Sequence, residues 1–326
     1  MKAAFITHTL HSRGFALTVA FFALVAACFY SYITPESIFS GDKGFGLPSA
    51  NLWAAPGTAN LVWALAGSAV TALLMWLLNK VHNVMRAMTS LYLALFSMMQ
   101  LATPELMTTV YTGTVLAVIV PLCMLLLFNC YRNPGATRQV FLTMCLLSFF
   151  SATQYCFIVY IPAFLIGCAQ MRIFNRRTLA AALMGIATPW IMLFGFGVID
   201  PTEMRMPEFV SIFQSIDFGD TLMLLLAVGT TVFAMLVCYV LNVFKTIAYN
   251  ARSRAINGVF TIVMLFTLIA MCADVRNLTS YVPLLNFCAA MEITHFFSTH
   301  RAERSFIAIM LILAVYLTFF ICQTVI

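Results

Sequence analysis

Charged residues are scarce in this chain. Its 326 residues include only 17 Lys and Arg and 11 Asp and Glu, so that 9% are charged, whereas 63% are hydrophobic. A soluble domain carries about a quarter of its residues as charged side chains, which cover its surface. This chain has too few to cover a globule of its size, which excludes a soluble fold. The composition predicts a protein whose outer surface faces lipid.

Metal-binding, disulfide and nucleotide motifs are also lacking. The ten cysteines lie in or beside apolar segments, without CxxC or matched Cys/His spacing, so we interpret them as small core residues. The glycine-rich residues 41–46 lack the GxxxxGK[ST] order of a phosphate-binding loop. His8, His11 and His82 are expected on the surface without matching acids. We therefore expect no metal, no cofactor and no nucleic-acid partner.

Long apolar segments fill most of the chain. At about 20 residues per membrane helix, the length allows roughly 10 to 12 crossings and no separate soluble domain. A β-barrel would instead show short segments of alternating polarity. The sequence thus predicts an all-α bundle of about 11 spans in one integral membrane domain, residues 1–326. The segments are 14–33, 60–78, 87–103, 106–128, 137–153, 155–171, 178–199, 221–244, 255–273, 278–298 and 305–325.

Two divisions between these segments depend on short polar breaks, at 103–105 and at 151–154. Basic residues support both. With a cytoplasmic amino terminus, all but three of the 17 Lys and Arg fall inside, and only Lys43, Arg205 and Arg276 fall outside. This asymmetry orients bacterial inner-membrane proteins. It predicts an odd number of spans, a cytoplasmic amino terminus and a periplasmic carboxyl terminus.

The acids gather on the opposite side. All except Glu292 and Glu303 fall in the outer connections, which fits either plain solvation of those loops or an acidic outward site. Two outer connections are long, at 34–59 and 200–220. In the second, Phe209, Ile212, Phe213 and Ile216 recur at helical spacing after a proline. This stripe predicts an amphipathic helix, lying in the outer interface or folded back onto the bundle.

Glu292 is the one acid expected inside the membrane, with His295 a turn later on the same face. Burying a carboxyl group in lipid costs about 2.5 to 3.5 kcal/mol on insertion scales, so the acid needs a reason to be there. It could pair with Arg301, Arg304 or another inside arginine as a structural lock. It could equally relay a proton or contact a substrate.

From about residue 79 onward, the order of features resembles an uncharacterised family of multi-spanning inner-membrane proteins of the Bacteroidetes. The family has no established activity, so the resemblance implies a location in the inner membrane but no catalytic residue. The segments that carry it are 79–83, 103–105, 155–162, 176–177, 185–190 and 282–301.

A looser architectural similarity is to polytopic glycosyltransferases that use polyprenyl-phosphate sugars. These also begin in the cytoplasm and place an acid in the first outer loop. The similarity implies that Asp42 is the general base on an acceptor hydroxyl, and that Lys43, Arg205 or Arg276 holds the lipid phosphate. Arg276 and the nearby Asp274 could also be an ordinary interface cap.

Two other functions stay open at this point. One is a proton-coupled transporter or lipid flippase that uses Glu292 and His295. The other is a non-catalytic subunit that holds an envelope complex together. Besides the lipid bilayer, the partners implied are a polyprenyl-linked sugar in the first case above and envelope proteins in the last.

Overall fold

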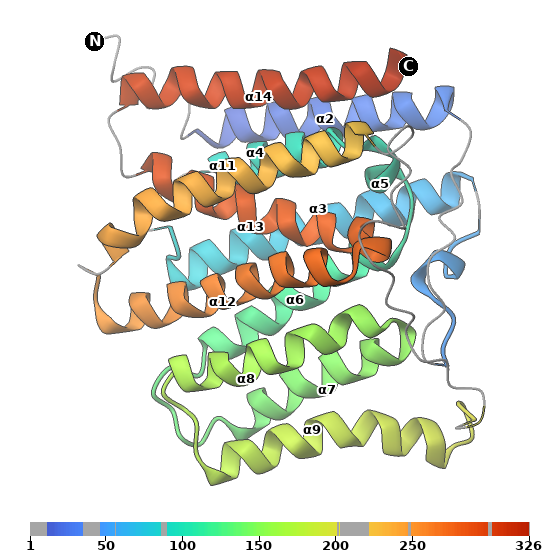
Figure 1. Ribbon diagram of the computed structural model, residues 1–326, viewed down its shortest axis with the longest axis vertical. Coiled ribbons are helices and arrows are strands. Elements are labelled where there is room, and N and C mark those ends of the chain that lie inside the picture. Colours follow the sequence, from blue (N-terminus) through green and yellow to red (C-terminus); the bar gives the residue numbers. More distant parts are fainter. Residues whose placement is uncertain are drawn as a thin grey trace.

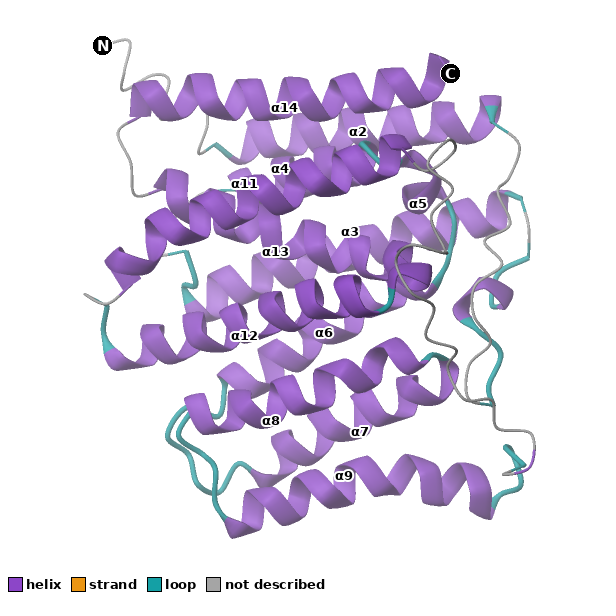
Figure 2. Ribbon diagram, viewed as in Figure 1, coloured by secondary structure: helices purple, strands orange, loops and turns teal. Residues whose placement is uncertain are grey.

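The computed structural model describes residues 12–34, 46–55, 57–85, 90–200, 202, 222–246, 249–298 and 302–325. Within these ranges the chain is helical, and Figure 2 shows only helices, turns and loops there. The predicted all-α class is confirmed. Six helical segments are long and apolar enough to cross a membrane: Arg13–Ile33, Thr58–His82, Arg176–Gly195, Leu222–Val243, Ala251–Ala273 and Phe306–Thr324. A helical membrane protein is thereby supported.

The α-helices overlap the apolar segments in order. Their bounds are α2 (Arg13–Ile33), α3 (Thr58–His82), α4 (Leu91–Leu101), α5 (Pro104–Thr108), α6 (Thr112–Phe128), α7 (Thr137–Thr153), α8 (Tyr160–Gln170), α9 (Arg176–Gly195), α11 (Leu222–Thr246), α12 (Ala251–Ala273), α13 (Leu278–Ser298) and α14 (Ala302–Val325). Three 3₁₀ turns are η1 (Ala50–Leu52), η2 (Tyr155–Val159) and η4 (Val275–Asn277).

Both predicted breaks are helix ends. α4 ends at Leu101, Thr103 leaves the helical conformation with φ −129° and ψ 70°, and Pro104 occupies the first turn of α5. Proline disfavours a helical residue before it and suits the start of a helix, which accounts for this geometry. At the second break, Gln154 is extended with φ −157° and ψ 133°. The polar residues at both positions therefore mark real interruptions.

The helices lie side by side, and the chain connects them at two ends (Figure 1). One end, on the left of Figure 1, holds the start of α2, the end of α3, the α6–α7 and α8–α9 connections and the start of α12. We call it the basic end because its connections carry arginines such as Arg132, Arg172 and Arg252. The opposite end holds α5 and the α12–α13 connection, where Arg276 lies.

α13 forms the centre of the bundle. Every residue from position 280 to position 295 is buried, because α4, α6, α11 and α12 pack around this helix. The outer helices differ: Phe21 on α2, Leu183 on α9 and Ile307 on α14 are mostly exposed. Such apolar surfaces suit contact with acyl chains. Polar side chains on α13 are thus held within protein and away from lipid.

One buried hydroxyl compensates for a proline in α6. Pro121 has no N–H, so it cannot donate the helical hydrogen bond that the Ala117 carbonyl would normally accept. The Thr71 hydroxyl of α3 lies 3.3 Å from that carbonyl oxygen, and 3.0 Å from the Gly67 carbonyl oxygen of its own helix. In an apolar environment every backbone carbonyl needs a donor. Thr71 therefore links α3 to α6 at the site of the missing bond.

The interpretation of the cysteines as core residues holds for six of the ten, and that of one histidine is wrong. All ten thiols are free; six are buried, three are half-buried and Cys272 is exposed. His82, expected on the surface, is buried, with its ring edge-on to Phe128 at 5.5 Å between centroids. The reason is the length of α3, which continues to His82 and so turns this side chain toward α6 rather than into a loop. His8 and His11 lie outside the described residues.

Candidate functional site

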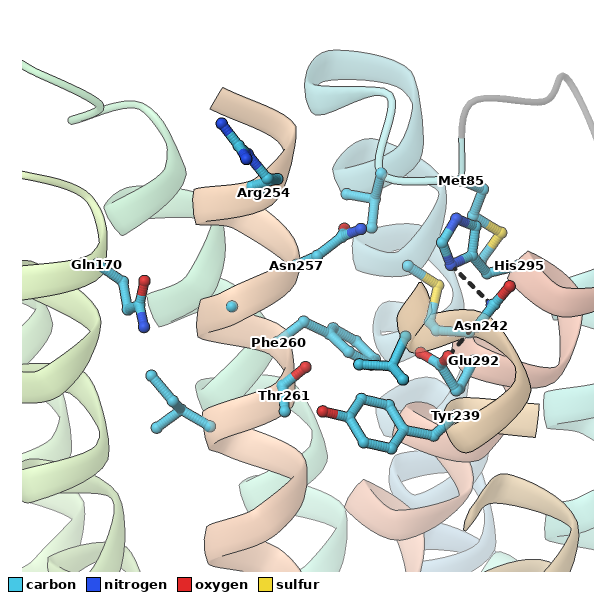
Figure 3. A pocket seen from close by; sticks show the side chains of 15 residues that line it. Met85, Gln170, Tyr239, Asn242, Arg254, Asn257, Phe260, Thr261, Glu292 and His295 are labelled. Carbon is cyan, nitrogen blue, oxygen red and sulfur yellow. Dashed lines mark hydrogen bonds between the residues drawn. The ribbon is translucent and has the colours of Figure 1, made fainter. Parts of the chain in front are cut away.

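A cavity at the basic end brings polar side chains together between α11, α12 and α13 (Figure 3). Its volume is about 340 Å³, near the lower end of the range for small-molecule sites. The wall of α11 includes Tyr239 and Asn242, and the wall of α13 includes Glu292 and His295. α12 adds a further polar face along the opposite wall, formed by Arg254, Asn257 and Thr261.

Glu292 and His295 share one hydrogen-bond partner. The side-chain amide nitrogen of Asn242 lies 3.3 Å from Oε1 of Glu292 and 3.1 Å from Nδ1 of His295. The Tyr249 hydroxyl lies 3.0 Å from the other ring nitrogen, Nε2. Both α13 side chains are more than nine-tenths buried. The sequence placed them one turn apart on one face of a helix, and α13 has that arrangement.

Proton positions follow from these contacts. An amide nitrogen has two protons, so Asn242 can donate to Glu292 and to Nδ1 of His295 together. The imidazole then accepts at Nδ1 and can donate from Nε2 to the Tyr249 oxygen. A neutral ring satisfies both of these contacts. If Glu292 instead carries a proton, the Asn242 amide can turn so that its oxygen accepts from the carboxyl group. The imidazole then takes its other tautomer, in which Nδ1 donates to the Asn242 oxygen and Nε2 accepts from the Tyr249 hydroxyl. The network thus accommodates two protonation states with the same residues.

The described residues include only some of the arginines that could pair with Glu292. Arg301 and the side chain of Arg304 lie outside the described residues, so the predicted lock with them is untested. Arg254 lies at the edge of the same cavity and is exposed, one turn from Asn257 (Figure 3). The cavity therefore contains a cation at its edge and a carboxyl group at its buried wall.

A second polar cluster lies at the opposite end of α13. Asp274 ends α12 and is only 5% exposed. Its Oδ1 accepts from the Tyr155 hydroxyl and its Oδ2 from the Tyr281 hydroxyl, each at 3.2 Å. The Asn277 amide lies 3.1 and 3.2 Å from the two carboxylate oxygens and also donates to the Tyr155 oxygen. Burial among these donors shows that Asp274 is not an exposed interface cap.

The other predicted site residues lie mostly outside the described ranges. This applies to Asp42, Lys43 and Arg205, and to the apolar stripe within 203–221. Arg276 is exposed in η4, two residues after Asp274. Asp200, after α9, accepts from the Thr202 hydroxyl at 2.7 Å and from its backbone N–H at 2.9 Å, which lowers the pKa of the Asp200 carboxyl. Asp200 therefore stays ionised near neutral pH.

Sequence reasoning did not identify several of these groups. Asn242 lies in an apolar segment, and its polarity alone is the signal that could have marked it. Tyr155, Asn277 and Tyr281 come from two distant parts of the chain, so only the fold brings them to Asp274. Among the described residues, no group of three or more His, Cys, Asp or Glu side chains has a geometry that could hold a metal ion.

No protein-family model, curated protein or solved structure gives a significant match to this chain. The resemblance to the Bacteroidetes family therefore stays a prediction.

Proposed function

We propose that the chain is an eleven-span protein of the bacterial inner membrane, with its amino terminus in the cytoplasm and its carboxyl terminus in the periplasm. The alternating direction of the helices and the basic connections at one end support this topology. In this orientation the cavity of Glu292 and His295 opens on the cytoplasmic side. Asp274 and Arg276 lie on the periplasmic side.

Within that topology, we propose that the protein is a proton-linked carrier of a small polar solute. The observation that carries this proposal is the buried Glu292–Asn242–His295 network in the wall of a cavity of about 340 Å³. A carboxyl group within a membrane bundle is costly and is typical of proton and substrate pathways. A cavity next to it supplies the space that a purely structural carboxyl group does not need.

The chemistry assigned to the residues is proton exchange coupled to solute contact. Glu292 takes a proton in one state and releases it in the other, while Asn242 turns its amide to donate to the carboxylate or accept from the carboxyl group. Asn257 and Thr261 offer hydrogen bonds to a polar solute from α12, and Arg254 offers a positive charge at the edge. Protonation of Glu292 removes its charge, which lowers the cost of enclosing the site among apolar helices.

The test starts from a panel of small polar compounds: amino acids, sugars, nucleosides and carboxylates. Compounds that raise the melting temperature of the purified protein are added to proteoliposomes loaded with a pH-sensitive dye. We expect at least one to move protons across the membrane with the wild type, and Glu292→Gln to abolish the dye response. Glu105→Gln is the matched control, because Glu105 is an exposed acid on α5 at the opposite end. An unchanged response with Glu292→Gln contradicts the proposal.

The glycosyltransferase function stays a prediction from sequence, because no described contact supports it. Its candidate base Asp42 and two of its three candidate phosphate ligands lie outside the described residues. Asp42→Asn is the comparison variant in the same proton assay: a carrier that uses the cavity keeps its proton response in Asp42→Asn and loses it in Glu292→Gln. A glycosyltransferase or a scaffold subunit predicts no proton response in the wild type or in either variant.

A further inference from the structure

Hydrogen-bond donors gather on one side of the cavity. Arg254, Asn257 and Thr261 recur at helical spacing along one face of α12 (Figure 3). Gln170, the last residue of α8, lines the cavity as well. Among the described residues, none forms a hydrogen bond or an ion pair with the side chains of Arg254, Asn257 or Gln170. These donors are therefore available to a solute.

Charge at the cavity entrance favours an anion. Of the described residues that line the cavity, Arg254 is the only cation and Glu292 the only acid. The other three acids whose side chains the structure describes lie at the opposite end of the bundle: Glu105, Asp200 and Asp274. A cleft lined by charge of one sign concentrates ions of the other sign. The entrance at the basic end therefore attracts anions and repels cations.

The inner part of the cavity suits an apolar group. Phe260 lies six residues after Arg254, which corresponds to about 9 Å along α12. Phe260 and Met291 line the cavity together with Glu292. A second carboxylate here would be repelled by Glu292. A solute with one carboxylate and a short apolar skeleton therefore matches both parts, with its charge at Arg254 and its carbon atoms at Phe260 and Met291.

We propose that the solute is a small monocarboxylate, held by Arg254 and carried together with one proton on Glu292. This inference rests on the carrier function proposed above and specifies its substrate class. The guanidinium group of Arg254 can donate two parallel hydrogen bonds to a carboxylate, and the Asn257 amide can donate a third. Glu292 takes one proton from water on one side of the membrane and releases it on the other, and no bond of the solute changes.

Charge balance couples the solute to the proton. The empty cavity contains Arg254 and an ionised Glu292, so its net charge is zero. The loaded cavity contains Arg254, the carboxylate of the solute and a protonated Glu292, and its net charge is again zero. With only the solute or only the proton bound, the cavity has a net charge, which is costly to enclose among apolar helices. One carboxylate and one proton therefore cross together.

Glu292 is the group that makes binding depend on pH. The other titratable groups nearby are His295 and Cys288 on α13, Tyr239 and Cys238 on α11, and Tyr249 in the α11–α12 connection. Tyrosine and cysteine side chains are neutral at pH 7, and a neutral ring satisfies the contacts of His295. α4 and α6, which also pack on α13, contain no charged residue. Lys80 and His82 in the last turn of α3 do not line the cavity.

Compounds that share a skeleton and differ in charge test the substrate class. Benzoate, benzamide and benzylamine form one set, and butyrate, butyramide and butylamine form another. Isothermal titration calorimetry on the purified protein measures each Kd. We expect at least one carboxylate to bind about tenfold or more tightly than its amide and its amine. Its affinity should fall as the pH rises, by up to about tenfold per pH unit, the limit for uptake of one proton. In Glu292→Gln its affinity should not depend on pH.

Arg254→Gln and Arg252→Gln form a matched pair. Arg252 is also an exposed arginine in the first turn of α12, but it does not line the cavity. We expect Arg254→Gln to weaken carboxylate binding by about tenfold or more and Arg252→Gln to leave it unchanged.

Several results would overturn the inference. These are equal effects of the two arginine substitutions, an amide or amine that binds as tightly as its carboxylate, wild-type binding that does not depend on pH, and no binding of any of the six compounds. None of them decides the carrier function, which fails separately if Glu292→Gln keeps the wild-type proton response in proteoliposomes.

Discussion

Buried polar side chains form the hydrogen-bonded clusters of this molecule. Asn242 illustrates the principle, because one amide side chain satisfies both Glu292 and His295 and can follow a change of protonation by turning over. A buried polar group without a partner costs free energy, so each such residue needs a donor or acceptor from a neighbouring helix. The contacts between α13 and α11 therefore include hydrogen bonds as well as apolar packing.

The Thr71 hydroxyl gives a prediction at this scale. Thr71→Val keeps the shape of the side chain and leaves the Ala117 carbonyl without the donor that replaces the missing Pro121 N–H. We expect a loss of about 1 kcal/mol, the usual worth of an interhelical hydrogen bond in a membrane bundle. The readout is the melting temperature of the purified protein, followed by tryptophan fluorescence.

A double-mutant comparison isolates that bond. In a Pro121→Ala background the backbone N–H is restored, so the Ala117 carbonyl regains its helical partner and Thr71→Val should cost less. Thr318→Val is the control, since the Thr318 hydroxyl is exposed and bonds only to its own helix at Ala314. Equal losses for Thr71→Val with and without Pro121 would show that the hydroxyl does not compensate for the proline.

At the scale of elements, close approach of two helices depends on a glycine. α9 packs chiefly on α7, and the Ser148 hydroxyl of α7 donates to the Ile186 carbonyl of α9 at 2.6 Å. A Cβ at Gly185 would lie 2.6 Å from the Phe141 carbonyl oxygen and 3.0 Å from the Cβ of Met144. Only glycine therefore allows the two backbones to come this close.

Gly185→Ala should accordingly push α9 away from α7. We expect a destabilisation of about 1 to 3 kcal/mol, the usual cost of overpacking, visible as a lower melting temperature. Gly229→Ala is the matched control, because Gly229 lies in α11 with no atom within 4 Å of its Cβ position. There, alanine should be neutral or slightly stabilising through its higher helix propensity. Equal effects of the two substitutions would contradict the close packing of α7 and α9.

The sequence predicted these elements well because apolar length and polar breaks are local signals. Both the break before Pro104 and the break at Gln154 could be located without the fold, since proline and isolated polar residues act on the chain next to them. Helix ends were harder. α3 continues to His82, beyond the end of its apolar segment at position 78, and the His82 ring packs against Phe128.

Sites were less predictable than helices. Glu292 and His295 share one helix, so their spacing alone placed them together. The donors to Asp274 come from η2 and α13, and Asn242 comes from α11, so each depends on tertiary contacts that have no local pattern. This difference explains why the sequence placed Asp274 at the outer end of a helix but did not predict the hydrogen-bonded cluster that buries it.

For the whole molecule, the two clusters divide the bundle into a cavity end and an Asp274 end. The buried α13 connects them, and the exposed apolar helices around it separate both clusters from lipid. A carrier needs a route between opposite sides of a membrane, and the two ends of a spanning bundle lie on opposite sides for any number of crossings. The topology decides which cluster faces the cytoplasm, so it is the premise of the proposed cytoplasmic opening of the Glu292 cavity.

A reporter fused after Ile326 measures that premise most directly. An enzyme that is active only in the periplasm, such as an alkaline phosphatase, is joined to the carboxyl terminus and compared with a fusion after Asn133, in the α6–α7 connection at the basic end. The eleven-span topology predicts an active reporter after Ile326 and an inactive one after Asn133. If the reporters after Ile326 and after Asn133 are both inactive in stable, membrane-bound fusions, the carboxyl terminus lies on the side of the basic end, which contradicts the account.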